Sequence, residues 1–188
     1  MASEAAVADH RARTSTYFNM LDQLVGDKLE GTRSTTPTRH LPIKLLKFGG
    51  LDFELVYAGP AHTVGDIFVW MPSQRIVFSG DIVYTERLLG PGPAQDTGSW
   101  VEVFEAMMSY EPVHIIPGHG HLATPAQARA DTYDYLTFLR GEIAKVIEEG
   151  GDIYAAVEID QSRFSHLKVF DLIARRNAQG VFAQMEFE

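Results

Sequence analysis

Two apolar runs joined by a short turn constrain the fold more than any other feature of this chain. The runs are "IFVWM" (residues 67–71) and "RIVFS" (residues 75–79), and "PSQ" connects them. Each has the length of a strand and lacks apolar–polar alternation, so we expect two neighbouring strands that are buried on both faces. A similar run at residues 113–116 predicts another buried strand. These strands indicate a layered core covered by other elements.

Helical patterns occur on both sides of these strands. Thr124, Pro125 and Gln127 form a capping box with proline in the first helical turn, which predicts the start of a long helix. Gly150 and Gly151 are expected to end it. Other helices are expected at residues 11–25, 99–109 and near 170–175, and a hairpin of residues 43–48 and 51–57 around Gly49-Gly50, with a possible last strand at 181–187. The pattern as a whole predicts a mixed α/β layered fold.

Composition limits the classes of function. A chain of 188 residues is most simply one domain, here residues 1–188. Its net charge of −9 argues against a nucleic-acid partner or an anionic membrane surface. No run is long enough to span a bilayer and the start lacks an apolar signal segment, so we expect no membrane association and a cytoplasmic location, with a signal peptide upstream as the alternative. The absence of cysteine means that any metal site must use histidine and carboxylate ligands.

Three ionisable residues stand where apolar runs end, each in a loop that contains glycine. They are His62, Asp81 and His119. Loops at one edge of a sheet converge, so these side chains are expected to meet there, and their nitrogen and oxygen atoms suit divalent zinc, iron or manganese. Taken singly, each has a plainer interpretation as a solvated loop histidine or a turn aspartate. The three together favour a metal site over a purely structural hydrogen-bonded cluster, which stays the alternative.

The segments "AHTVGD", "FSGD" and "PGHG", in this order and at these separations, resemble the motifs of the metallo-β-lactamase-fold hydrolases. The resemblance extends from about Pro42 to the end of the long helix. It implies that His62 binds a first metal, that Asp81 bridges two metals and acts in catalysis, and that His119 binds the second. Asp66 is implied as an outer partner that orients a ligating histidine, or is simply a turn residue.

One element of the family pattern is missing from this chain. The family's HxHxDH motif supplies four of seven metal ligands, and the histidines that precede His62 are His10 and His40, neither within such a motif. We therefore expect an N-terminally truncated αββα sandwich, a single partial domain that lacks the first half of the fold. Removing that half should expose apolar strand surface, so self-association is also expected.

The resemblance implies a metal-dependent hydrolase with two zinc ions, or iron or manganese in their place. Metal-bound hydroxide would attack an ester, lactone, thioester, amide or phosphate group of a small-molecule substrate. With three of the seven ligands, this chain is expected to be at best weakly active. The alternative is a non-catalytic binding domain with a degenerate metal site. Tyr84 and Trp100 border a Gly/Pro-rich loop at residues 86–98 and are candidates for a substrate cleft or for the core.

Overall fold

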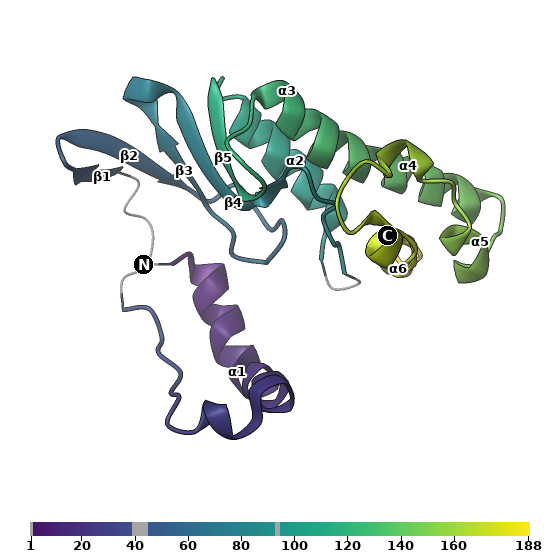
Figure 1. The fold of residues 1–188 in the computed structure, drawn as a ribbon, viewed down its shortest axis with the longest axis horizontal. Coiled ribbons are helices and arrows are strands. Elements are labelled where there is room, and N and C mark those ends of the chain that lie inside the picture. Colours follow the sequence, from purple (N-terminus) through teal and green to yellow (C-terminus); the bar gives the residue numbers. More distant parts are fainter. Residues whose placement is uncertain (1, 39–44, 93–94) are drawn as a thin grey trace.

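The protein forms a five-stranded sheet with helices packed against one of its faces (Figure 1). The computed structural model describes residues 2–38, 45–92 and 95–188. The strands are β1 (Leu45–Phe48), β2 (Leu51–Val56), β3 (Phe68–Met71), β4 (Ile76–Tyr84) and β5 (His114–His119). The α-helices are α1 (Glu4–Val25), α2 (Thr97–Met108), α3 (Pro125–Ala128), α4 (Asp134–Glu148), α5 (Ile153–Val157) and α6 (Phe170–Met185). Short 3-10 turns are Gly26–Leu29, Pro72–Gln74 and Ser162–Phe164, and a π-helical turn spans Arg129–Tyr133.

The strands lie in chain order across the sheet. Neighbours from β1 to β4 are antiparallel, whereas β4 and β5 are parallel and are connected by a crossover that contains α2. The predicted hairpin is confirmed for its described residues, while residues 43 and 44, like His40 and Pro42, lie outside them. Gly49 and Gly50 both have positive φ, at 57° and 78°, as the tight turn between β1 and β2 requires.

One face of the sheet builds the core. Trp70, Val77 and Ile115 are aligned across β3, β4 and β5, and all three are buried beneath the helices together with residues of α2 and α4. The neighbouring row on the opposite face behaves differently: Phe78 is 38% exposed and Ile116 is 36% exposed. The prediction of a strand buried on both faces is therefore wrong for β4, and the buried strand predicted at residues 113–116 is likewise exposed on one face. Successive strand residues point to opposite faces, and helices cover only one of these faces.

The helices that the sequence pattern predicted before residue 181 are present in the structure. The Thr124 hydroxyl accepts a hydrogen bond of 3.2 Å from the Gln127 N–H, which confirms the predicted cap. The helix continues through the π-helical turn into α4. The predicted last strand at residues 181–187 is wrong, because α6 occupies most of this segment and buries Val181 and Phe182. These residues share a helical face with Ala174 and Ala178, so the period there is that of a helix.

Helix α1 is attached to the sheet layer through its first turn. Ser3 caps it by accepting the Ala6 N–H, and the Ser3 hydroxyl donates a 2.8 Å hydrogen bond to the Gly65 carbonyl. A Cβ at Gly65 would come within 2.4 Å of the Ala6 side chain, so this approach requires glycine. The later turns extend away from the sheet, as Figure 1 shows, and expose Met20 and Leu24. Among the described residues, no helix combines the length and apolarity needed to cross a membrane.

Candidate metal centre

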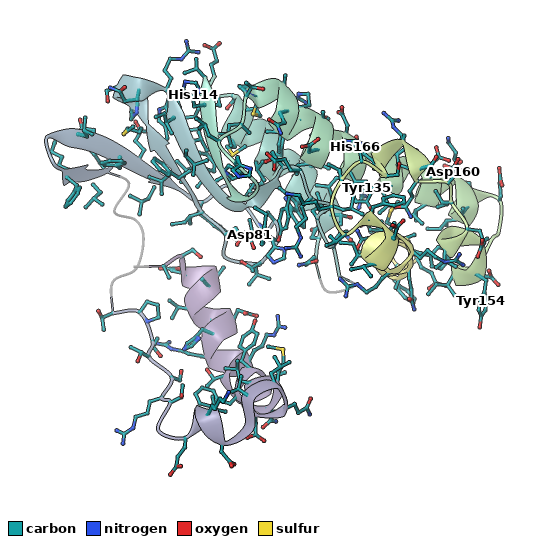
Figure 2. The ribbon with its side chains drawn as sticks, viewed as in Figure 1. Asp81, His114, Tyr135, Tyr154, Asp160 and His166 are labelled. Atoms are coloured by element: carbon teal, nitrogen blue, oxygen red, sulfur yellow. The ribbon has the colours of Figure 1, made fainter. Side chains whose placement is uncertain are left out.

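His62, Asp81 and His119 converge at one end of the sheet. His62 lies in the loop between β2 and β3, Asp81 lies in β4, and His119 is the last residue of β5. The distance from His62 Nε2 to Asp81 Oδ2 is 3.7 Å, and that from His119 Nε2 to Asp81 Oδ1 is 3.9 Å. Figure 2 shows Asp81 at the end of the sheet that faces α1, opposite the end that carries His114. The expected convergence of the three side chains is confirmed.

Asp81 reaches this position through an irregularity in β4. The sequence predicted that the strand ends before Asp81, whereas β4 continues to Tyr84. Its pairing with β5 shifts between Phe78 and Gly80 and again between Gly80 and Tyr84. Gly80 has a φ of 52°, a conformation that favours glycine. Such bulges change which side chains point to which face, and here they place the Asp81 carboxylate between the two histidines.

The glycines of "PGHG" allow close approach on both sides of His119. A Cβ at Gly118 would lie 2.0 Å from Asp81 Oδ1. Gly120 has a φ of 103°, and a Cβ there would lie 2.1 Å from the Thr85 hydroxyl. A residue other than glycine would displace Asp81 at position 118, and at position 120 it would displace Thr85, whose N–H donates to the His119 carbonyl. The glycines are therefore part of the site's geometry and not only turn formers.

Tyr84 is a member of the site that the sequence indicated only as a cleft or core residue. Its hydroxyl donates a 3.2 Å hydrogen bond to Asp81 Oδ2, and its ring stacks on His119 with 4.6 Å between ring centroids. Burial raises the pKa of Tyr84 far above its ordinary value, the charge and hydrogen bond of Asp81 add to this, and the positive charge of Arg87 opposes it. Tyr84 therefore remains protonated and acts as a hydrogen-bond donor to Asp81.

Gln95 and Trp100 hold the orientation of His62. The Gln95 amide donates a 2.7 Å hydrogen bond to the His62 carbonyl and lies 3.3 Å from His62 Nδ1. The edge of the Trp100 ring packs against the imidazole at 5.6 Å between centroids, and the Trp100 N–H donates to the Ile82 carbonyl. Trp100 is thus a core residue that supports the site. Gln95 was not singled out in the sequence because it lies in an irregular loop without a motif.

Asp66 belongs to the turn that carries His62. One of its carboxylate oxygens accepts the Thr63 N–H at 2.8 Å, and the other accepts a hydrogen bond from the Thr63 hydroxyl. Both oxygens are therefore engaged by the neighbour of His62. This geometry favours the simpler of the two interpretations of Asp66, a turn residue that shapes the loop.

Imidazole nitrogens and carboxylate oxygens are donor types that divalent metals accept. Two ligand atoms that each lie about 2.0–2.2 Å from one tetrahedral ion are roughly 3.3–3.6 Å apart. The two nitrogen–oxygen distances at Asp81 are slightly longer, and they involve different oxygens and different histidines. Within residues 2–38, 45–92 and 95–188, no group of three or more His, Asp or Glu side chains is placed so that it could hold one metal ion. The described residues therefore offer one histidine beside each oxygen of Asp81, His62 at Oδ2 and His119 at Oδ1.

A pocket of about 400 Å³ opens beside His62, between α1 and the loops of the sheet. From α1, Asp9, Arg13 and Tyr17 form one wall, and residues 60–64 form another. The Arg13 guanidinium lies over the Tyr17 ring at 5.1 Å, and the Tyr17 hydroxyl is 3.4 Å from Asp9. The sequence did not predict that this helix lines the site, because its residues precede His62 by about fifty positions.

Comparisons with known proteins identify a family and a fold. A family model described as "Metallo-beta-lactamase superfamily" matches residues 14–119, a range that contains His62, Asp66, Asp81 and His119. A metallo-beta-lactamase type 2 from Bacillus sp. (strain 170) is 33% identical over 79 residues, which are 40% of this chain and 31% of that protein. This chain thus spans about a third of that relative's length.

Two solved structures are similar to this chain in fold. A metallo-beta-lactamase from Pontibacter korlensis is 22% identical with a TM-score of 0.50, and the match covers 63% of this chain and 54% of that one. A stereoselective inverting sec-alkylsulfatase from Pseudomonas sp. is 14% identical with a TM-score of 0.63, covering 78% of this chain and 26% of that one. These likenesses concern the fold, and the family model covers more than half of the chain. The chain belongs to the metallo-beta-lactamase superfamily.

Proposed function

We propose that this chain provides His62, Asp81 and His119 as ligands in the site of a metal-dependent hydrolase, with zinc as the first candidate ion and iron or manganese as alternatives. The observation that carries the proposal is the orientation of Asp81. Its two oxygens face two different imidazoles, Oδ2 towards His62 and Oδ1 towards His119. A carboxylate placed in this way suits the role of a bridge between two metal positions.

The chain's own residues position the ligands and a substrate. A divalent ion bound there would polarise the scissile bond and lower the pKa of a water molecule. Tyr84 holds one oxygen of Asp81, while Gln95 and Trp100 hold His62. The pocket beside His62 has room for a small-molecule ester, lactone, thioester, amide or phosphate, with α1 as one wall.

We expect weak activity from this chain by itself. A catalytic zinc normally has three protein ligands and a water, whereas the described residues place only one histidine beside each oxygen of Asp81. The chain also spans about a third of its Bacillus relative, so the activity of the longer protein is carried over here only as a proposal. The shortage of ligands favours a second candidate function, a non-catalytic domain with a degenerate metal site.

Metal binding and turnover test these two functions separately. The purified chain is titrated with Zn²⁺ by calorimetry, alongside Asp81→Ala and Asp52→Ala, a matched control on the exposed hairpin. The proposal expects saturable binding that Asp81→Ala abolishes and Asp52→Ala retains. The loaded chain is then assayed with lactone, thioester, β-lactam, sulfate-ester and phosphodiester substrates. Turnover that Asp81→Ala abolishes supports the hydrolase, metal binding without turnover supports the degenerate site, and absence of metal binding contradicts both.

A further inference from the structure

A buried polar network in the helical layer has no role in the site described above. Its centre is Asn177 of α6, whose side chain is completely buried. The Asn177 amide donates hydrogen bonds of 2.7 Å to the Leu89 carbonyl and 3.0 Å to the Tyr135 hydroxyl. The Tyr135 hydroxyl in turn donates a 2.9 Å hydrogen bond to Gln161 Oε1. Figure 2 shows Tyr135 among the helices, apart from Asp81 at the end of the sheet.

The network determines which end of the Asn177 amide faces the Leu89 carbonyl. Gln161 Nε2 donates to the Ala174 carbonyl at 2.9 Å, which keeps Gln161 Oε1 towards Tyr135. Burial raises the pKa of Tyr135 far above its ordinary value, and the Asn177 hydrogen bond only partly opposes this, so the hydroxyl keeps its proton and donates it to Gln161. Towards Asn177 the hydroxyl is therefore an acceptor, and the NH2 group must lie between Tyr135 and Leu89. Asn177 Oδ1 is left without a partner among the described residues, a costly arrangement that indicates that the donor to Leu89 is needed.

Leu89 belongs to a short segment that follows β4 and leads towards Gln95. We call residues 88–92 the anchor segment. Leu88 and Leu89 are completely buried, so the start of this segment is packed into the core. Pro91 is also buried, and its ring restricts the backbone at this position. The Asn177 hydrogen bond at Leu89 therefore constrains the position of the whole anchor segment.

The end of the anchor segment orients Gln95. The Gly92 N–H donates to Gln95 Oε1, and the Gln95 N–H donates to the Gly92 carbonyl at 3.1 Å. Because Oε1 faces Gly92, the NH2 group of the Gln95 amide faces His62 and donates to its carbonyl at 2.7 Å. A continuous series of contacts thus leads from Asn177 through the anchor segment and Gln95 to His62.

We propose that Asn177 is a positioning residue for His62 and acts through the anchor segment and Gln95. Asn177 does not line the pocket beside His62, so its effect on the site is indirect. Without the Asn177 donor, the Leu89 carbonyl loses its partner in the helical layer and the anchor segment can shift, and with it Gln95. The consequence for metal binding rests on the proposed function, in which His62 is a ligand. The orientation of the His62 ring does not, because the same contacts hold it in the metal-free chain.

The first test follows the His62 ring in the metal-free full chain. Histidine ring ¹H and ¹⁵N resonances are recorded by NMR for the wild type, Gln95→Ala, Asn177→Ala and Asn177→Leu, which fills the buried space but also lacks the donor. We expect both Asn177 variants to shift the His62 resonances in the same direction as Gln95→Ala, while those of His114, at the opposite end of the sheet, stay in place.

Ala178→Gly, at the neighbouring buried position of α6, is the matched control, because it lowers helix stability without removing the hydrogen bond to Leu89. His62 resonances that keep their wild-type positions in the Asn177 variants, or that move equally in Ala178→Gly, overturn the proposal.

The second test asks whether Asn177 acts through Gln95. Competition with a chelating dye measures the Zn²⁺ affinity of Asn177→Leu, Gln95→Ala and the double variant. We expect each single variant to bind Zn²⁺ about tenfold more weakly, and the double variant to lose no more, because both changes remove the same contact with His62. Losses that multiply in the double variant contradict a route through Gln95. A wild-type chain that binds no Zn²⁺ contradicts the proposed metal site, while the ring resonances still decide whether Asn177 positions His62.

Discussion

The Tyr84 hydroxyl donates its hydrogen bond to Asp81 Oδ2, the same oxygen that lies closest to His62 Nε2. The other oxygen, Oδ1, lies closest to His119, on whose ring Tyr84 stacks. A single buried tyrosine therefore contacts one candidate metal ligand directly and supports a second. Its hydrogen bond holds the carboxylate in the orientation in which each oxygen faces a different histidine.

Replacing Tyr84 by phenylalanine should weaken metal binding while preserving the fold. Phenylalanine keeps the stacked ring but loses the donor to Asp81, and loss of such an outer partner costs about tenfold to a hundredfold in metal affinity. Competition with a chelating dye measures the Zn²⁺ affinity. Tyr154→Phe is the control, because Tyr154 is 77% exposed on α5 (Figure 2). Equal affinities for Tyr84→Phe and the wild type would contradict a role in positioning Asp81.

Gly118→Ala should damage both stability and metal binding. The added Cβ would lie 2.0 Å from Asp81 Oδ1, so the strand end must shift, at a cost of about 1–3 kcal/mol in the free energy of unfolding. Chemical denaturation measures this cost. The matched control is Gly141→Ala in α4, where the new methyl group meets no atom within 4 Å and helix propensity predicts stabilisation of about 0.5–1 kcal/mol. The prediction fails if Gly118→Ala is as stable as the wild type and binds Zn²⁺ equally well.

The exposed face of the sheet should make the chain self-associate, as its sequence led us to expect. Phe78 and Ile116 lie opposite each other on β4 and β5 on the face without helices. We expect concentration-dependent association in sedimentation velocity, and a shift towards monomer in Phe78→Lys or Ile116→Lys. Leu172→Lys, at a 78% exposed site on α6, provides the control. A wild-type chain that stays monomeric at high concentration would rule out association through this face.

The ion pair between Glu105 and Arg129 should contribute to the acid dependence of stability. The hydrogen bond from Arg129 lowers the pKa of Glu105 below its ordinary value of 4.5, with a further contribution from a hydrogen bond with Tyr133. A depressed folded-state pKa gives stability that is present above the unfolded pKa and is lost as the pH falls through the lower folded value. Glu105→Gln should therefore reduce the loss of melting temperature on acidification below pH 4.5.

Melting curves of wild type and variant between neutral pH and about pH 3 provide the check. Arg129→Gln should flatten the same part of the profile, because it removes the partner that lowers the Glu105 pKa. If both variants kept the wild-type acid dependence, this pair would have no part in it.

Local chemistry in the sequence determined several elements and the principal site residues. Gly49-Gly50 specifies the hairpin because both positions need a positive φ, and Thr124 with Gln127 specifies a helix start through one cap hydrogen bond. The positions of His62, Asp81 and His119 in glycine-containing loops were visible for a similar reason. Each of these positions depends on a backbone that can bend close to the candidate ligand. Glycines near it in the sequence provide that freedom.

Relations between distant or irregularly placed residues were decided by the tertiary structure. Tyr84 follows Asp81 by three positions, which in a regular strand puts it on the opposite face, and only the bulges in β4 bring the two together. Similarly, the docking of α1 through Ser3 at Gly65 places Asp9 and Arg13 beside His62. A residue's own sequence neighbours constrain its conformation, but the side chains that it meets depend on how strands pair and helices pack. The candidate ligands could therefore be identified from the sequence, whereas the residues that orient them could be identified only from the tertiary structure.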